Sequence, residues 1–350
     1  FLPGVVTTSD AGAGIGYTGI RVRGSDASRV NVTINGIPFN DSESQGTFWV
    51  NLPDFTSSVD NIQLNRGVGT STNGAGAFGA SLNLITQGVS DEAFAEIASS
   101  FGSFNTFKNT VKFSTGLLNE RFELSGRVAT IASDGYIDRA SSDLKSYFFQ
   151  GLYKDQNTLI KALTFGGSEI TYQSWYGIDS GTLATNRTYN KAGEMYNSTG
   201  VLTGHYDNQV DNYKQDHFQF HWTQQYNSFW SSTIGLNYTY GRGYYEEYND
   251  LWATQNIAFG DEVNFDYLQI TPLVSGGTTI DTTENISRKW LDNNFYVGTF
   301  SLNYDSNQTN AVFGGSYSIY NGDHFGNLIW AQYASSAAPN HRFYESNADK

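Results

Sequence analysis

Apolar and polar residues alternate along the long segments that follow residue 91, and this period of two constrains the fold more than any other feature. For example, Phe218, Phe220 and Trp222 alternate with Gln219 and His221. Because successive side chains of a strand point to opposite faces, such a segment has one apolar face and one polar face. Comparable alternation recurs at 121–133, 228–248 and 291–305. A chain of this kind forms a sheet with one apolar face, either in a sandwich or in a barrel.

The composition agrees with a chain made of strands and turns. Among the 350 residues, aromatic residues account for 15% and glycine occupies 37 positions, whereas there are only 5 prolines. Aromatic side chains favour the pleated surface of a sheet, and glycine favours turns. We therefore predict a mostly β protein.

The sequence predicts about nine long strands, and the connections between them are sorted by length. The predicted strands are residues 92–101, 104–116, 121–133, 144–154, 158–172, 215–226, 228–248, 291–305 and 309–320. Connections after the second, fourth, sixth and eighth strands are tight, and those after the third, fifth and seventh are long. Only the short connection after the first strand departs from this order. Short turns at one rim and long loops at the other are typical of a transmembrane antiparallel β-barrel, whereas a soluble sandwich gives no reason for such sorting.

Nine strands do not close a barrel of this type, because an open edge in lipid leaves backbone groups without hydrogen-bond partners. We therefore expect the sequence to be the N-terminal part of a larger protein.

Charge and cysteine content exclude several classes of function. The formal net charge is −14, which argues against a nucleic-acid partner because phosphates bind to basic surfaces. With no cysteine, the chain has neither a disulfide framework nor a thiolate metal site.

Four motifs between residues 17 and 86 carry a resemblance to a known family. They are GIRVRGSD at 19–26, RVNVTINGIPFND at 29–41, VDNIQLNRGVGTS at 59–71 and GAGAFGASLNLIT at 74–86. In this order they resemble the plug domain of TonB-dependent outer-membrane receptors, the active transporters of Gram-negative bacteria. The sequence of these motifs is most similar to that of receptors from Bacteroidetes. Two positions depart from the family pattern, since Asn35 replaces the usual Asp and Gln63 replaces the usual acidic residue.

The resemblance implies a plug domain folded inside the lumen of a barrel of about 22 strands. On this template, residues 1–88 are an N-terminally incomplete plug domain, and residues 91–350 are the N-terminal portion of the transmembrane barrel, incomplete at its C-terminus. The implied location is the outer membrane, in contact with lipid and lipopolysaccharide. The implied partner is TonB with its inner-membrane motor.

The family also implies a function, which is the energy-coupled import of a scarce nutrient. A ferric siderophore or another iron chelate is the expected cargo. The main alternative is uptake of a glycan or peptide together with a surface lipoprotein. A passive porin, a surface adhesin and a secreted carbohydrate-binding or hydrolytic β-sandwich are rival classes, and the plug motifs speak against the first two.

Six residues after the Asn-Gly-Ile-Pro strand are candidates for substrate contact at the apex of the plug. Polar and aromatic groups together suit the orientation of a polar ligand, although a loop pinned against the wall would contain the same residues. The six are Asn40, Asp41, Glu43, Gln45, Phe48 and Trp49. The segment from Thr7 to Tyr17 is a second candidate apical loop, and Trp175 and Tyr176 lie in an expected outer loop.

Arg23 and Arg66 stand in the Arg-Gly positions of the family motifs. The resemblance implies that they pair with barrel glutamates and latch the plug, and a plain structural salt bridge is the alternative. The partner glutamates are expected to lie beyond Lys350.

No catalytic constellation appears in the sequence. Glu246 and Glu247 are adjacent, so on a strand they face opposite sides. His217 and His221 share a face but lie about 13 Å apart at the usual strand rise, which is too far for one metal. We therefore predict a protein that is not an enzyme and has neither a metal site nor a cofactor.

Overall fold

The computed structural model describes residues 3–68, 78–255, 260–334 and 340–350. Residues 69–77, at the end of the third motif and the start of the fourth, lie outside the described residues. Within the described ranges, none of the helices has the length and apolar character needed to cross a membrane.

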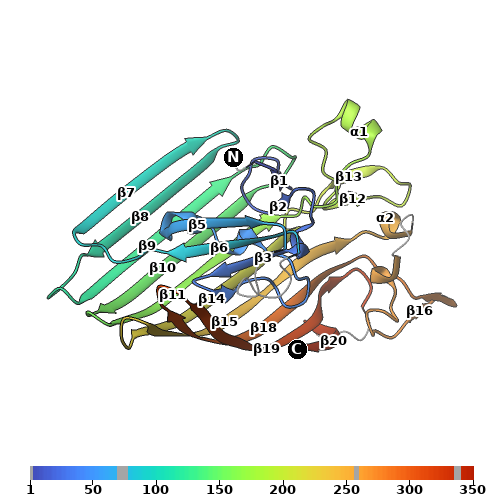
Figure 1. Ribbon diagram of the computed structural model, residues 1–350. Coiled ribbons are helices and arrows are strands. Elements are labelled where there is room, and N and C mark those ends of the chain that lie inside the picture. Colours follow the sequence, from blue (N-terminus) through green and yellow to red (C-terminus); the bar gives the residue numbers. More distant parts are fainter. Residues whose placement is uncertain (1–2, 69–77, 256–259, 335–339) are drawn as a thin grey trace.

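Ten long strands form one antiparallel sheet, in which each strand pairs with the next long strand of the sequence (Figure 1). We call this sheet the wall. Its strands are β7 (Ala93–Gly102), β8 (Thr106–Thr115), β9 (Phe122–Ser133), β10 (Ser142–Lys154), β11 (Thr158–Tyr172), β14 (Val210–Gln225), β15 (Trp230–Asn249), β18 (Asn285–Asp305), β19 (Asn310–Ala331) and β20 (His341–Asp349). The nine predicted strands are all present, but the predicted number is wrong by one because β20 was missed. The second half of β20 is polar, and it lacks the alternation by which the other strands were recognised.

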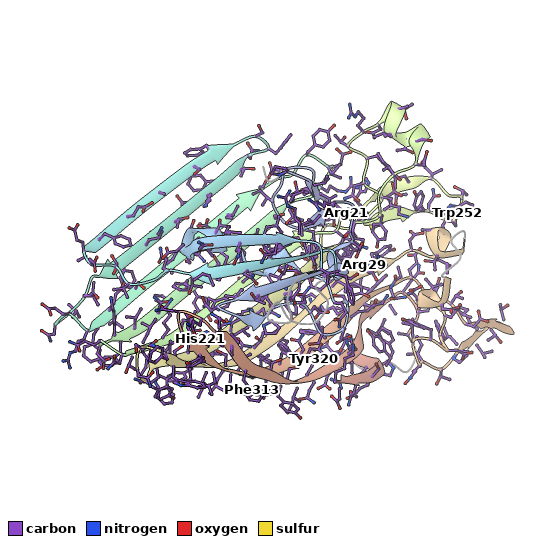
Figure 2. The ribbon with its side chains drawn as sticks, in the orientation of Figure 1. Arg21, Arg29, His221, Trp252, Phe313 and Tyr320 are labelled. Carbon is purple, nitrogen blue, oxygen red and sulfur yellow. The ribbon has the colours of Figure 1, made fainter. Side chains whose placement is uncertain are left out.

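The two faces of the wall have the reverse of the usual burial. Phe218, Phe220 and Trp222 share one face of β14 and are 48%, 39% and 38% exposed. Gln219, on the other face, is only 5% exposed. Phe313 likewise projects from the outer side of the wall (Figure 2). An apolar outer face and a covered polar inner face are the pattern of a barrel in lipid, not of a sandwich with a dry apolar seam.

The connections are sorted as the sequence predicted. One end of the wall has the short connections 116–121, 155–157, 226–229 and 306–309. The other end has the long connections and, as the expected exception, the short connection 103–105. Figure 1 shows the small elements of the long connections gathered at that end. They are α1 (Ser180–Thr185), β12 (Glu194–Tyr196), β13 (Leu202–His205), α2 (Leu251–Gln255), η5 (Gly260–Val263), β16 (Leu273–Ser275) and β17 (Thr278–Ile280).

The segment before the wall, which we call the N-terminal segment, forms two small sheets against the wall's inner face (Figure 1). One sheet pairs β1 with β2, and the other has the order β4-β3-β6-β5 with β3 and β6 parallel. The elements are β1 (Val5–Ser9), β2 (Thr18–Val22), η1 (Ala27–Arg29), β3 (Val30–Ile34), β4 (Ile37–Pro38), η2 (Trp49–Asn51), η3 (Phe55–Ser58), β5 (Val59–Arg66) and β6 (Ala80–Thr86).

Asn35 has a structural reason to be an amide. It and Gly36 join β3 to β4 with φ angles of 54° and 79°, which suit an Asn-Gly hairpin turn. Its Oδ1 accepts a hydrogen bond from the Thr86 amide at 3.0 Å, and its Nδ2 donates to Gln219 Oε1 of the wall at 3.3 Å. An aspartate could not make the second contact, because an ionised carboxylate only accepts.

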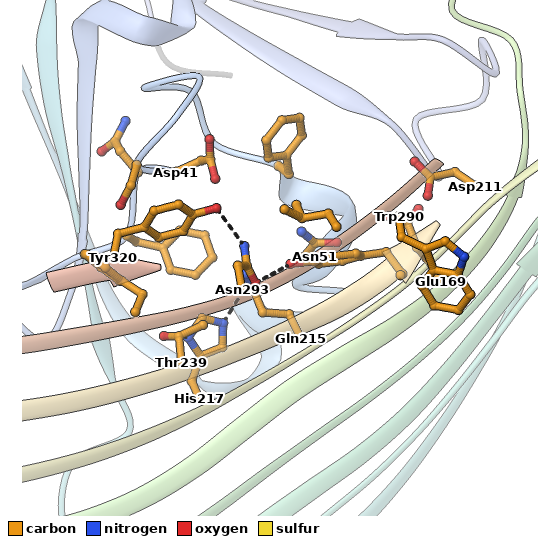
Figure 3. Close-up of a pocket in the computed structure, with 18 of the residues that line it drawn as sticks. Asp41, Asn51, Glu169, Asp211, Gln215, His217, Thr239, Trp290, Asn293 and Tyr320 are labelled. Carbon is orange, nitrogen blue, oxygen red and sulfur yellow. Dashed lines mark hydrogen bonds between the residues drawn. The ribbon is translucent and has the colours of Figure 1, made fainter. Parts of the chain in front are cut away.

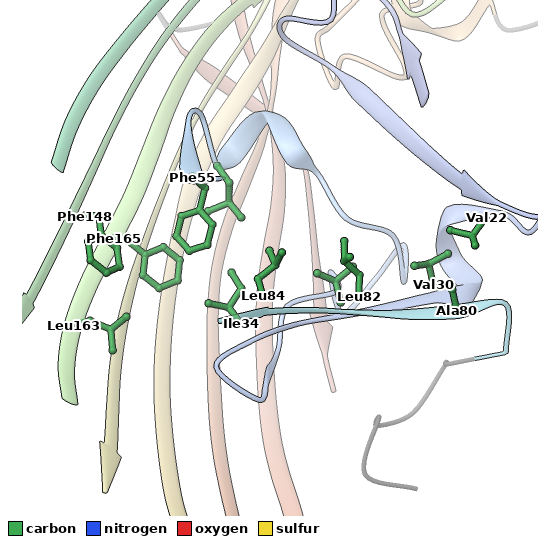
Figure 4. Close-up of a cluster of buried hydrophobic side chains, with 12 residues drawn as sticks. Val22, Val30, Ile34, Phe55, Ala80, Leu82, Leu84, Phe148, Leu163 and Phe165 are labelled. Carbon is green, nitrogen blue, oxygen red and sulfur yellow. The ribbon is translucent and has the colours of Figure 1, made fainter. Parts of the chain in front are cut away.

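The core of the N-terminal segment continues into the wall (Figure 4). Side chains of β3 and β6, including Ile34 and Leu84, pack with Phe55 of η3. The Phe55 ring lies 5.0 Å from that of Phe165, which points inward from the wall. Burying a phenylalanine contributes about 1.5–3 kcal/mol, so this contact helps to anchor the N-terminal segment on the wall. A second apolar cluster joins Val50 of the segment to Ile131 and Leu144 of the wall.

The orientation of the wall predicts the effect of a charge on its outer face. A strand crosses the hydrocarbon with about 9–11 residues, so Phe220 falls near the middle of a crossing counted from the turn end of β14. Phe220→Arg should therefore lower the free energy of unfolding in bilayers by about 2–4 kcal/mol. Denaturant titration, read by the migration of folded and unfolded barrel on gels, measures this change. Phe220→Leu is the matched control and should stay near the parent, and an equal effect of both variants would contradict the assigned faces.

Candidate functional site at the apex of the N-terminal segment

The loop that follows β4 is shaped by its own polar side chains. Asn40 Oδ1 accepts a hydrogen bond from the Val32 amide at 2.6 Å, and its Nδ2 donates to two nearby carbonyls. Asp41 Oδ1 accepts from two backbone amides of the next residues. Gln45 Nε2 donates to a backbone carbonyl within the loop. The sequence therefore specifies a preformed loop, whose position is fixed before any ligand arrives.

Glu43 connects this loop to the wall. Its carboxylate accepts hydrogen bonds from the Tyr320 hydroxyl and from His324 Nε2, the latter at 3.0 Å. Burial alone would raise the pKa of Glu43, but the bonds from Tyr320 and His324 outweigh it and lower the pKa below its usual value. The residue therefore stays ionised at neutral pH and ties the loop to β19.

A cavity of about 270 Å³ lies between this loop and the wall (Figure 3). Asn40, Asp41 and Phe48 of the predicted apex line it. The other three predicted residues have different surroundings. Trp49 packs against the core of the N-terminal segment, and Glu43 and Gln45 make the contacts described above. Substrate contact by any of the six stays a prediction.

The wall contributes most of the lining of this cavity, and the sequence did not identify these residues. They include Glu169, Asp211, Tyr213, Gln215, His217, Gln219, Asn237, Thr239, Trp290, Asn293 and Tyr320. Except for Trp290, they lie at the alternate positions of β11, β14, β15, β18 and β19 that face inward, and this alternation was a signal for the inner face. That signal could not tell which part of the inner face meets the apex, because strand register and wall curvature decide this.

Aromatic rings gather beside the cavity. Tyr17 belongs to the second predicted apical loop, and its ring centroid lies 5.8 Å from that of Trp175 and 6.5 Å from that of Phe48. Trp175 in turn contacts Tyr245 at 6.3 Å. Phe48 remains 42% exposed, so it can still contact a ligand. The rim therefore offers apolar ring faces next to polar groups, which is typical of small-molecule sites.

Tyr17 also joins the apex to the wall through its hydroxyl, which donates to Asp211 Oδ2 at 2.6 Å. Burial, followed by the charges of Glu169 and Asp211, raises the pKa of Tyr17 far above its usual value. The hydroxyl therefore remains protonated and acts as a donor at any physiological pH.

A buried ion pair clamps the N-terminal segment at a second place. Asp54 adopts a left-handed conformation with φ of 53°, and its carboxylate accepts from Lys108 Nζ and from Thr110 Oγ1. Arg127 NH1 lies 3.5 Å from Asp54 Oδ2. The Arg127 Nε donates to Ser58 Oγ at 2.8 Å. Two adjacent wall strands thus hold the turn that precedes and includes η3.

Gly167 of β11 lets the same turn approach the wall closely. A Cβ at this position would lie 2.5 Å from the Asn51 carbonyl oxygen and 2.6 Å from Pro53 Cδ. Glycine is therefore required for the observed contact between backbone and wall.

The predicted arginine latch is not formed within the described residues. Arg66 NH1 donates to the Pro3 carbonyl at 3.0 Å, and the Arg23 amide donates to the Gly4 carbonyl. Neither arginine forms an ion pair with an acidic side chain in the described part of the chain. Pairing with a glutamate beyond Lys350 stays a prediction. The clamp that is present has the reverse polarity, with the acid on the N-terminal segment and the bases on the wall.

Comparison with known proteins agrees with this architecture. Residues 1–81 match the family described as TonB-dependent Receptor Plug Domain. The fold is similar to the ferric citrate transporter FecA in the unliganded form, at a TM-score of 0.65 and 14% identity. It is also similar to the ferric-catecholate import receptor Fiu from E. coli K12, at a TM-score of 0.61 and 13% identity. The TM-score to the pyoverdine outer membrane receptor FpvA from Pseudomonas aeruginosa PAO1 is 0.59, at 11% identity. Comparison with curated proteins gives no match.

The chain spans about half the length of these structures. The matches cover 99%, 97% and 97% of this chain but 48%, 51% and 45% of FecA, Fiu and FpvA respectively. Residues 1–81 thus match the plug-domain family of TonB-dependent receptors, and the chain has the fold of the outer-membrane receptors named above. We therefore call the N-terminal segment the plug from here on.

The Asp54 clamp predicts a loss of stability when its charge is removed. Asp54→Asn leaves the Arg127 guanidinium buried without a carboxylate, which costs about 3–5 kcal/mol. Amide hydrogen exchange in residues 53–59 should accelerate, because the plug turn would open more often. Asp60→Asn is the control, since Asp60 is exposed and bonds only to the Gly88 amide. Unchanged exchange in Asp54→Asn would show that the clamp contributes nothing.

The same clamp predicts how stability depends on pH. Burial would raise the pKa of Asp54, but the hydrogen bonds from Lys108, Ser57 and Thr110 outweigh it and lower the pKa below its usual value. A lowered pKa in the folded state stabilises above the unfolded value of about 3.9, and this stabilisation disappears as the pH falls through the folded pKa. Denaturant titrations should therefore show a constant difference between parent and Asp54→Asn from pH 5 to 7, and a shrinking difference below about pH 4. A difference that shrinks on raising the pH would contradict this assignment.

Proposed function

We propose that the receptor containing this chain imports a nutrient across the outer membrane, using energy delivered by TonB. The observation that carries the proposal is the cavity between the plug apex and the wall. A ligand in this cavity contacts Phe48 and Asp41 of the plug together with residues of the wall such as Asn293. Binding is therefore linked to the part of the protein that must move to open a path through the barrel.

Part of the contact between plug and wall can be exchanged for water. Hydrogen bonds and ion pairs join the two at several places, such as Asn35 to Gln219 and Asp54 to Lys108. Water replaces such contacts at modest net cost, since a typical hydrogen bond contributes only about 0.5–1.5 kcal/mol. Apolar contacts between plug and wall form two clusters among the described residues, one around Phe55 and Phe165 and one around Val50 and Ile131. These contacts support a plug that holds its position at rest and moves under force.

We propose an iron chelate as the cargo. The similar structures include receptors for ferric citrate, ferric catecholates and pyoverdine. The rings of Tyr17, Phe48 and Trp175 offer apolar faces for the organic part of such a chelate. Uptake of a glycan or peptide with a surface lipoprotein is the competing cargo, because the same rings suit sugar stacking.

We propose the division into a plug at 1–88 and a barrel portion at 91–350. The last plug strand ends at Thr86, and the first wall strand begins at Ala93. Gln150 Nε2 and Lys161 Nζ of the wall donate to the Gln87 carbonyl at 3.1 and 3.0 Å, so the wall holds the junction on its inner face.

We also propose that the receptor catalyses no covalent reaction. The adjacent acids Glu246 and Glu247 both form ion pairs with basic side chains of the wall. Glu246 pairs with Arg288 at 2.6 Å, and Glu247 pairs with Lys289 at 3.2 Å. Both acids therefore stabilise the end of the wall that carries the long connections.

Uptake of iron-55 from ferric chelates by iron-limited cells tests the proposed function. Deletion of the gene should abolish uptake of one chelate, and a protonophore should abolish uptake by the parent. In the complemented strain, Phe48→Ala with Trp175→Ala should raise the half-saturating concentration about tenfold or more, because two apolar contacts are lost.

Trp330→Ala is the control for this experiment, since Trp330 is an exposed ring outside the cavity and should leave uptake unchanged. A deletion strain that keeps its iron uptake but fails to grow on a polysaccharide would overturn the iron assignment in favour of glycan uptake.

A further inference from the structure

Two acidic side chains meet at one end of the apex cavity without a basic partner. Glu169 of β11 and Asp211 of β14 lie on adjacent strands, where Asp211 is opposite Thr171. Both line the cavity, and the charge of each acts on the Tyr17 hydroxyl. Figure 3 shows them at the end of the cavity away from Tyr320. Among the described residues, neither acid forms an ion pair with Lys, Arg or His within 4.0 Å.

Glu169 is the more deeply buried of the two, with 1% exposure. Its Oε2 accepts a weak hydrogen bond from the Thr171 hydroxyl at 3.3 Å, and its Oε1 has no donor among the described atoms. A buried carboxylate needs a proton or a cation to balance its charge, and a buried acceptor without a donor is costly.

Two further acceptors in the same cavity also lack donors. Asn51 Oδ1 comes from the plug and Asn237 Oδ1 from β15, and the side chains are 8% and 7% exposed. Among the described residues, three buried side-chain atoms of the cavity lining have no hydrogen-bond partner, and all three are acceptor oxygens. The cavity thus offers acceptors to a ligand that brings donors.

The charges around the cavity do not supply the missing cation. Lys289 lines the cavity, but its Nζ lies 3.2 Å from Glu247 and 3.6 Å from Glu262. His324 faces Glu43. The third acid of the lining, Asp41, is occupied by backbone amides of its own loop. The Glu169–Asp211 end therefore has no basic partner. Burial, followed by the charge of Asp211, raises the pKa of Glu169 well above its usual value, so Glu169 holds a proton unless a cation takes its place.

We propose that the Glu169–Asp211 end of the cavity is a subsite for an organic ammonium group of the transported ligand. An ammonium brings positive charge and several N–H donors, and so matches both the unbalanced carboxylates and the acceptors without donors. A hard metal ion fits less well, since it requires six or more oxygen ligands, and the described residues contain no group of three or more His, Asp or Glu placed to hold a metal.

This inference deepens the proposed function, because it rests on the cavity being the ligand site and adds the charge that the ligand presents there. It distinguishes among iron chelates, since an all-carboxylate chelate would be repelled at this end and one bearing an amine would be attracted.

The test is calorimetric titration of the purified full-length receptor in detergent with three probes. They are 1,4-diaminobutane, the uncharged 1,4-butanediol and calcium chloride. We expect saturable binding of the diamine and none of the diol. Glu169→Gln should weaken diamine binding by about tenfold or more, because one charge-assisted contact is lost. Asp211→Asn is a second variant with the same expectation.

Glu123→Gln is the matched control. Glu123 is also a buried acid on the inner face, but its oxygens accept from Ser114 Oγ and the Ser90 amide, and it lies outside the cavity. This variant should bind the diamine as the parent does.

Several outcomes would overturn the subsite. They are no saturable diamine binding, equal binding of diamine and diol, binding of calcium without the diamine, or an equal loss in Glu123→Gln. The comparison of diamine with diol uses the parent protein, so it decides the question even if a variant fails to fold. Because binding is measured without TonB or an energy source, its outcome is independent of the uptake experiment.

Discussion

The membrane sets the constraint on which the rest of this structure depends. Hydrocarbon offers no hydrogen bonds, so each strand of the wall must pair its backbone with its neighbours and turn apolar side chains outward. Phe218, Phe220 and Trp222 follow this rule, and alternation then leaves His217, Gln219 and His221 for the inside. The inner face is thus polar because the apolar side chains of the same strands are needed on the outer face.

A polar inner face determines how the plug is held. An apolar interface of this size would bind the plug firmly and non-directionally, whereas the observed contacts are directional and separate. Asn35, Asp54 and Glu43 each reach a different part of the wall, and the apolar clusters around Phe55 and Val50 anchor the plug between these points. Such an interface is specific in position but consists of contacts that water can replace one at a time. That combination suits the proposed movement of the plug under force.

The same geometry creates the cavity. The plug apex does not fill the space above it, because the loop after β4 is folded on itself through Asn40 and Asp41. The wall strands facing this space carry polar side chains, and the buried acceptors without donors that line it come from β11, β15 and the plug. The proposed ligand site and the contacts that retain the plug are therefore neighbouring parts of one interface, since Tyr17 and Asp211 line the cavity and also join the apex to the wall.

By itself, the sequence determined the strands, their faces and the order of long and short connections, because a period of two and the turn residues are local properties. It also determined the plug, through motifs whose glycines and asparagines meet local backbone requirements, as Asn35 and Gly36 do. It did not reveal β20, whose second half lacks alternation. Only the tertiary structure decided that Asp54 meets Lys108 and Arg127, and that Glu169, Asp211 and Asn51 share a cavity. These pairs are separated by dozens of residues, and their meeting depends on the curvature of the wall and the depth at which the plug sits, which no local pattern records.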